Sequence, residues 1–233
     1  RGEESEPIKF TSYEPESDGT DDWGGIEFYN ATRDTSVLDH CIIENILKKD
    51  PEKERGSIFT SNSLVKISNS AIQNNSAPFG GAVETTDSYL YLFKNKILNN
   101  TVSFQGAAVY ICHANGPSKG DIPRTIITKN VIMENKTELI ERPEFSSGGI
   151  FVFENNMTES YTLIQENDII ANNCLSAGKV SGGIGGGVQI RTQSKYLIDV
   201  IGNKIMYNRA ESGGGLAVVS NQEERILIDT LTT

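Results

Sequence analysis

Residues 92–100 read LFKNKILNN, and this arrangement recurs along the whole chain. Ile97 is followed three residues later by an asparagine, Asn100, and preceded five residues earlier by an aliphatic residue, Leu92. The equivalent isoleucine and asparagine pairs are Ile42/Asn45, Ile72/Asn75, Ile97/Asn100, Ile132/Asn135, Ile169/Asn172 and Ile205/Asn208. The aliphatic residues are Val37, Ile67, Leu92, Ile127, Ile164 and Val200, and two residues before each isoleucine stand His40, Ser70, Asn95, Asn130, Asn167 and Asn203. A pattern copied at intervals of 25–37 residues predicts a repeat protein.

A second motif lies between these segments and consists of a glycine pair, or near-pair, followed by alternating apolar residues. Examples are 24–28, 80–83, 106–111, 148–152, 186–190 and 214–218. The period of two and the short runs indicate strands rather than helices. We therefore expect an all-β solenoid of about six to seven coils stacked about 4.8 Å apart. Isoleucine stacks would fill its interior, and asparagine and glycine would form its corners.

The pattern hxxNxIxxN followed by GGhxh resembles the right-handed parallel β-helix repeat of the pectin-lyase-like superfamily. The resemblance extends from Ile8 to about Ile228, and residues 80–83 (GGAV) also resemble the GGA-aliphatic motif of bacterial polymorphic outer-membrane adhesins. Residues 22–26 (DWGGI) resemble a segment common in large β-helical cell-surface proteins. The resemblance implies a right-handed parallel β-helix. It leaves the function open, because lyases, hydrolases, epimerases, adhesins and surface-layer components share this fold.

Composition narrows the partners of this 233-residue chain. Its 21 basic and 31 acidic side chains give a formal net charge of −10, which argues against nucleic acid and against anionic lipid. No apolar run approaches the roughly 18 residues of a membrane-spanning helix, so no membrane insertion is expected. The repeat predicts one domain over residues 1–233. Strand-like runs near both ends favour a segment of a longer or processed chain.

Catalytic motifs of the related enzymes are missing from the sequence. The resemblance would imply Asp/Glu calcium ligands and an Arg or Lys base in lyases, or NTD, GHG and RIK motifs in polygalacturonases, but NTD, GHG and RIK do not occur. His40 occupies a ladder position and is expected to form a corner hydrogen bond, whereas His113 falls in a turn-rich loop with no evident partner. We therefore assign no catalytic residue. If the chain is nevertheless an enzyme, the candidates are Asp21, Asp22, Asp199 and Arg191.

An acidic loop precedes Trp23 and contains Asp18, Asp21 and Asp22. Hard oxygen ligands suit calcium, so this loop is the candidate metal site, although it matches no known calcium-loop spacing and a solvated acidic loop is the alternative. We expect no other cofactor.

The three cysteines, Cys41, Cys112 and Cys174, form no CxxC motif. We expect mainly buried thiols, and the sequence leaves a disulfide open.

Alternation along the glycine-led strands predicts an apolar outer face. If Ile150 points inward, then Phe151 and Phe153 point outward, as do Tyr29 and Tyr110. Such a face suggests a partner surface, or stacking on sugar rings. The alternative is that the chain covers it with its own insertions at 113–124 and 136–147.

Five N-x-S/T sequons occur, at Asn30, Asn74, Asn99, Asn135 and Asn156. Asn135 is a ladder residue and should be inaccessible, which leaves Asn30, Asn74, Asn99 and Asn156 as glycosylation candidates.

These features together favour a non-enzymatic extracellular or cell-surface protein, such as a surface-layer, sheath or adhesin component. Neither end contains a capping helix, so we expect assembly through the outer face and the open coil ends, with copies of itself or with other surface proteins. The alternatives are a carbohydrate-active enzyme, namely a polysaccharide lyase, hydrolase or epimerase, and a non-catalytic sugar-binding β-helix.

Overall fold

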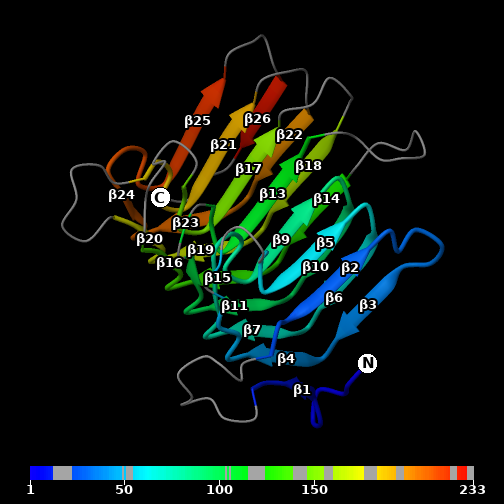
Figure 1. Ribbon diagram of the computed structural model, residues 1–233. Helices are drawn as coiled ribbons and strands as arrows, with labels where there is room; N and C mark the ends of the chain where they lie inside the picture. The colour runs from blue at the N-terminus through cyan, green and yellow to red at the C-terminus, as the bar shows by residue number, and fades with distance from the viewer. Residues whose placement is uncertain are drawn as a thin grey trace.

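The computed structural model describes residues 1–12, 23–48, 50, 55–102, 104, 106–114, 124–138, 146–154, 160–175, 183–192, 197–220 and 225–229. All regular secondary structure in these residues is β-strand, and the strands pair in parallel. Figure 1 shows the coils stacked in chain order, from the blue N-terminal strands to the red C-terminal strands. The prediction of an all-β parallel β-helix is confirmed.

One coil illustrates the repeat. It runs through β9 (Val83–Thr86), β10 (Tyr89–Phe93), β11 (Lys96–Leu98) and β12 (Thr101–Val102), and β13 (Val109–His113) then pairs with β9 to begin the next coil. The tight corners between strands use the left-handed backbone region, at φ angles of 47° for Asp87, 55° for Lys94 and 53° for Asn99. A left-handed residue turns the chain sharply without disturbing the strands on either side.

The strands form four sheets, which we name A to D. In spatial order, sheet A contains β1 (Ile8–Phe10), β4 (Cys41–Glu44), β7 (Ala71–Gln73), β11, β15 (Val131–Met133), β19 (Asp168–Ile170) and β23 (Lys204–Met206). Sheet B contains β2 (Ile26–Tyr29), β5 (Ile58–Ser61), β9, β13, β17 (Ile150–Glu154), β21 (Val188–Thr192) and β25 (Leu216–Ser220).

Sheet C contains β3 (Ser36–Asp39), β6 (Leu64–Ser68), β10, β14 (Arg124–Thr128), β18 (Tyr161–Gln165), β22 (Leu197–Ile201) and β26 (Arg225–Asp229). Sheet D contains the short strands β8 (Ser76–Ala77), β12, β16 (Lys136–Thr137), β20 (Asn173–Cys174) and β24 (Arg209–Ala210).

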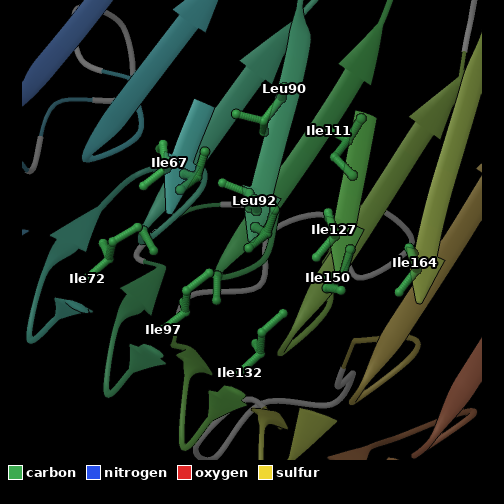
Figure 2. Packing of buried hydrophobic residues seen from close by; sticks show 14 of the residues in the cluster. Ile67, Ile72, Leu90, Leu92, Ile97, Ile111, Ile127, Ile132, Ile150 and Ile164 are labelled. Carbon is green, nitrogen blue, oxygen red and sulfur yellow. The ribbon is translucent and has the colours of Figure 1, made fainter. Parts of the chain in front are cut away.

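Aliphatic side chains stacked from coil to coil fill the interior. Ile97 pairs in register with Ile72 on one side and Ile132 on the other, and all three are fully buried. Figure 2 shows these side chains together with those of Leu92 and Ile127 from sheet C, all lying in the space between the sheets. Each buried aliphatic side chain contributes roughly 1.5–3 kcal/mol of transfer free energy, so the stacks are the main stabilising term.

Two ladders of asparagines, all buried except the half-buried Asn208, run along the corners beside sheet A. In one of them, the side-chain amide of Asn95 donates to Oδ1 of Asn130 at 3.1 Å and to the carbonyl oxygen of Ile67 at 2.8 Å. The second ladder links Asn75, Asn100, Asn135, Asn172 and Asn208 in the same way. Each amide therefore satisfies backbone groups that the corner would otherwise leave unpaired.

The register expected for the first coil is wrong by one residue. Ile43, rather than Ile42, pairs with Ile72, and Leu38, rather than Val37, pairs with Ile67. Asn45 lies at a left-handed corner with a φ of 59°, and the buried Ile46 takes the position of Asn75 in the ladder. This register lets asparagine adopt the left-handed conformation that it tolerates well, and it buries one more aliphatic side chain.

The same one-residue change of register in the first coil alters the position of His40. It takes a left-handed corner with a φ of 51°, equivalent to Asn69 at 49°, and Cys41 holds the ladder position, where its backbone N–H donates to Oγ of Ser70 at 3.0 Å. The expectation that His40 belongs to the ladder is therefore also wrong.

Candidate functional site

The outer face of sheet B carries two rows of side chains. Ile150 and Val152 belong to the interior core, whereas Phe151 belongs to a separate apolar cluster outside it. The first outward row is Glu27, Phe59, Glu84, Tyr110, Phe151, Gln189 and Ala217, and the second is Tyr29, Ser61, Thr86, Cys112, Phe153, Arg191 and Val219.

The chain itself covers part of this face. Tyr110 and Phe151 stack with ring centroids 5.3 Å apart, and they pack with Phe79 and Ala107 from the turns that lead into sheet B. Phe151 is fully buried and Tyr110 is 8% exposed, whereas Phe153 is half-buried. Tyr29 alone of the four candidate aromatic residues is well exposed, at 57%. Most of the aromatic surface that the sequence predicts for the outer face of sheet B is therefore covered by the chain itself and is not accessible to a partner.

A polar cluster built around the buried side chains of Glu84 and Lys48 lies on the same face over the first three coils. Oε2 of Glu84 accepts a hydrogen bond from the backbone N–H of Gly56 at 2.6 Å, and burial raises the pKa of Glu84 to about 7. The buried Lys48 ammonium donates to the Gly56 carbonyl oxygen at 3.0 Å and lies 3.4 Å from a carboxylate oxygen of Glu27. Arg55 lies over the rings of Phe59 and Phe79, with its guanidinium carbon 5.9 and 5.8 Å from their centroids.

This cluster holds residues 55–56 against sheet B through a carboxyl group that titrates near neutral pH. The sequence signal that could have revealed it is an acidic residue, Glu84, in an otherwise apolar outward row.

A buried histidine–glutamate pair lies inside the solenoid at the corner between sheets B and C. Nδ1 of His113 lies 2.7 Å from Oε1 of Glu154, its partner in register, and both side chains are fully buried. Ser160 donates to the other carboxylate oxygen at 2.9 Å, and the Thr125 hydroxyl lies 3.4 Å from Nε2 of His113. The expectation that His113 has no partner is wrong. Its burial inside the solenoid fits a structural corner, because a substrate would have no access to the imidazole ring.

The outer face of sheet C carries an accessible aromatic surface. Tyr91 and Phe93 stack with ring centroids 5.7 Å apart and ring planes 13° apart, and both side chains are half-buried. Lys66 lies over the Tyr91 ring and Lys94 over the Phe93 ring, with ammonium-to-centroid distances of 5.6 and 5.2 Å.

A hollow of about 560 Å³ adjoins these rings on the side of the following coils. We call it the sheet C hollow. It is lined by Tyr91, Phe93, Ile126, Thr128, Lys129, Leu163, Gln165 and Glu166. Sequence reasoning did not propose this surface, although residues 89–93 (YLYLF) contain the signal, because inward Leu90 and Leu92 require outward Tyr91 and Phe93.

Of the four candidate catalytic residues, Asp199 and Arg191 are described, and they lie on different faces, whereas Asp21 and Asp22 lie outside the described residues. Asp199 lies in the outward row of sheet C and accepts a hydrogen bond from the Tyr161 hydroxyl at 3.1 Å, whereas Arg191 lies in the outward row of sheet B. The structure therefore does not bring these two residues together.

The acidic loop of Asp18, Asp21 and Asp22 lies outside the described residues, so the calcium site stays a prediction. Across the described part of the chain, no group of three His, Cys, Asp or Glu side chains could hold a metal ion.

All three cysteines are free thiols. Cys41 and Cys174 are buried and Cys112 is half-buried, and burial raises the pKa of both Cys112 and Cys174 to about 12. These two thiols stay protonated at neutral pH, which suits a packing role.

Three glycosylation candidates, Asn30, Asn74 and Asn99, are exposed at left-handed corners. Asn135 is buried within the ladder, and Asn156 lies outside the described residues.

The described residues include no helix long and apolar enough to cross a membrane. Comparison with known proteins adds no identity, since no family model, no curated protein and no solved structure matches the chain.

Proposed function

We propose that this chain is a non-enzymatic structural β-helix of an extracellular or cell-surface assembly, and that copies associate by stacking a further coil on the last coil that the structure describes. The observation that carries the proposal is the accessible interior of that coil. Ile228 and Val218 occupy inward positions in register with Val200 and Ile190, which are fully buried, yet they are 41% and 43% exposed.

The strands of the last coil support the same proposal. β23, β25 and β26 each stand at the end of their sheet, so one edge of each strand has no partner strand among the described residues. A parallel strand from a second copy would pair with that edge and bury the exposed interior residues. Parallel pairing requires a head-to-tail arrangement, in which the first coil of one copy lies on the last coil of the next.

We also propose that the chain is related to a known superfamily of β-helices. The hxxNxIxxN and GGhxh repeat together with four all-parallel sheets supports membership of the pectin-lyase-like superfamily of right-handed β-helices. The buried polar groups of this solenoid stabilise its corners, which is what we would expect of a structural or adhesive member of that superfamily.

Sedimentation velocity over a range of protein concentrations tests the association. The protein should sediment as a concentration-dependent series of oligomers, and Ile228→Asp should abolish the series by placing a charge in the coil interface. Leu227→Asp is the matched control, because Leu227 is the adjacent residue of β26, is similarly exposed at 39% and points to the outer face. A wild-type protein that stays monomeric at all concentrations, or two variants that associate equally, would contradict the proposal.

A further inference from the structure

We propose that the outer face of sheet A binds the same face of a second copy, so that two chains associate side by side about a two-fold axis. This contact goes beyond the proposed stacking of coils, because it uses the flank of the solenoid instead of its end. The argument rests on an apolar stripe, an exposed tyrosine and the order of the charges along the coils.

The outer face of sheet A carries an apolar stripe. Two rows of side chains point outward from β7, β11, β15, β19 and β23, which Figure 1 shows as successive rungs of the solenoid. The first row is Ala71, Lys96, Val131, Asp168 and Lys204, and the second is Gln73, Leu98, Met133, Ile170 and Met206. From Leu98 onward the second row is entirely apolar, and each of its side chains is only half-buried. A continuous apolar row of this kind favours contact with a partner.

An exposed aromatic ring lies at one end of this stripe. Tyr207 follows Met206 at a left-handed corner with a φ of 58°, and it is 77% exposed. This is the largest exposed fraction among the large hydrophobic side chains that the structure describes. Tyrosine and methionine are enriched in protein–protein interfaces, so their exposure on this face favours a protein partner.

The charges on this face identify a second copy as that partner. Lys96 lies on β11, and Lys94 occupies the corner just before this strand. Asp168 lies on β19, two coils further on, and Glu166 occupies the equivalent corner. All four side chains are exposed, so one coil of the face is basic and another is acidic. Such a face is complementary to itself when the order of the coils is reversed.

A two-fold axis that lies over β15 and parallel to it produces this reversal. It sets β11 against β19 of the partner subunit, so that Lys96 faces Asp168 of the partner subunit, and symmetry forms this pair twice. The same axis sets Leu98 against Ile170 of the partner subunit and brings the two Met133 side chains together. An axis along the solenoid would set each coil against the same coil, where neither Lys96 nor Asp168 would meet an opposite charge.

The size of the face sets the strength of the association. The five strands span about 24 Å along the solenoid, and the distance between the corners at the two ends of each strand is about 17 Å. This footprint is smaller than the roughly 800 Å² per partner of a standard interface. We therefore expect a dimer with a dissociation constant in the micromolar range.

Sedimentation equilibrium of the Ile228→Asp variant tests this contact without stacking of coils. The variant should form a dimer and no larger species. Addition of Lys96→Glu should weaken the dimer by at least tenfold, because both symmetric pairs then contain two carboxylates, and further addition of Asp168→Lys should restore it. Arg124→Glu is the matched control, because it makes the same change of charge at an exposed position of sheet C and should leave the dimer unchanged.

The position of the axis gives a second test. The exposed Glu134 follows Met133 at a left-handed corner, so the axis over β15 brings it close to Glu134 of the partner subunit. Glu134→Gln should therefore tighten the dimer, whereas Met133→Asp should abolish it by placing two carboxylates at the axis. Circular dichroism of each variant verifies that the fold is intact.

An Ile228→Asp variant that stays monomeric at millimolar concentration would overturn the proposal. A dimer that Lys96→Glu does not weaken, or that Asp168→Lys does not restore, would overturn it as well by placing the contact elsewhere. The two kinds of association fail separately. Lys96→Glu alone should remove the side-by-side contact and leave the stacking, whereas Ile228→Asp should remove the stacking and leave the dimer.

Discussion

The side-chain amide of Asn100 donates a hydrogen bond to Oδ1 of Asn135 at 3.0 Å, from one coil to the next. The same amide donates to the carbonyl oxygen of Ile72 at 2.9 Å, and Oδ1 of Asn100 accepts hydrogen bonds from Asn75. One buried side chain thus connects three coils, and the exposed outer faces rest on this scaffold.

Asn100→Ala should destabilise the protein by roughly 3 kcal/mol, because it leaves several buried donors and acceptors unpaired. Urea unfolding followed by circular dichroism measures the change. Asn99→Gly is the control, since Asn99 is exposed at a left-handed corner that glycine also accepts. Similar shifts for the two variants would show that the ladder is not a source of stability.

Ile97→Asp should prevent folding or melt the central coils. It places a carboxylate among fully buried isoleucines, where its neighbours in register, Ile72 and Ile132, have no polar group to pair with it. The neighbouring Leu98→Asp, on the half-buried outward face, should be tolerated far better. Hydrogen exchange measures the protection of the central strands, and full protection in Ile97→Asp would contradict the interior register.

Glu84→Gln should stabilise the protein at alkaline pH. The pKa of Glu84 is raised from an ordinary value of 4.5 to about 7, so its contribution to stability is complete below about pH 4.5 and is lost as the pH rises through 7. The advantage of the variant should therefore be small at pH 5 and reach about 3 kcal/mol at pH 8.

Thermal unfolding of both proteins from pH 5 to pH 8.5 measures this difference. Glu166→Gln makes the same substitution at an exposed position and is the control for the loss of a carboxylate as such. A constant difference between Glu84→Gln and the wild type across this range would show that the carboxyl group does not titrate as described.

Glu154→Ala should cost roughly 3 kcal/mol or more, because it leaves buried His113 and the Ser160 hydroxyl without their partner. Chemical unfolding at pH 7.5 measures the loss. Glu166→Ala removes an exposed carboxylate of the same type and should change the stability by less than about 1 kcal/mol. Equal losses of stability in the two variants would mean that the buried His113–Glu154 pair does not stabilise the fold.

Expression in a host that N-glycosylates secreted proteins should place sugar on Asn74 or Asn99 and none on Asn135. The first two are exposed, whereas Asn135 is buried and fully hydrogen-bonded. Peptide mapping by mass spectrometry reads the occupancy, and sugar on Asn135 of folded protein would contradict the ladder.

Sequence reasoning was sufficient for the periodic parts of the molecule. Ile72, Ile97 and Ile132 repeat at matched offsets from ladder asparagines, and stacked coils make such offsets a direct readout of register. The predicted register of the first coil was wrong because either of two adjacent isoleucines, Ile42 and Ile43, could face the interior. The neighbouring Asn45 also suits both a ladder position and a left-handed corner.

The surface was harder to predict because it depends on segments without a period. Tyr110 and Phe151 were correctly placed on the outward side of sheet B, but their burial depends on Phe79 and Ala107 in turns of irregular length. The pairing of His113 with Glu154 similarly requires β13 and β17 to end in register, which no local pattern reveals.

Electron microscopy of the protein at high concentration tests the central proposal most directly, namely that copies stack coil upon coil. The expected result is rods of uniform width in wild-type and Leu227→Asp samples, and separate short particles in Ile228→Asp samples. Separate particles in all three samples, or rods in all three, would contradict assembly through the interior of the last coil.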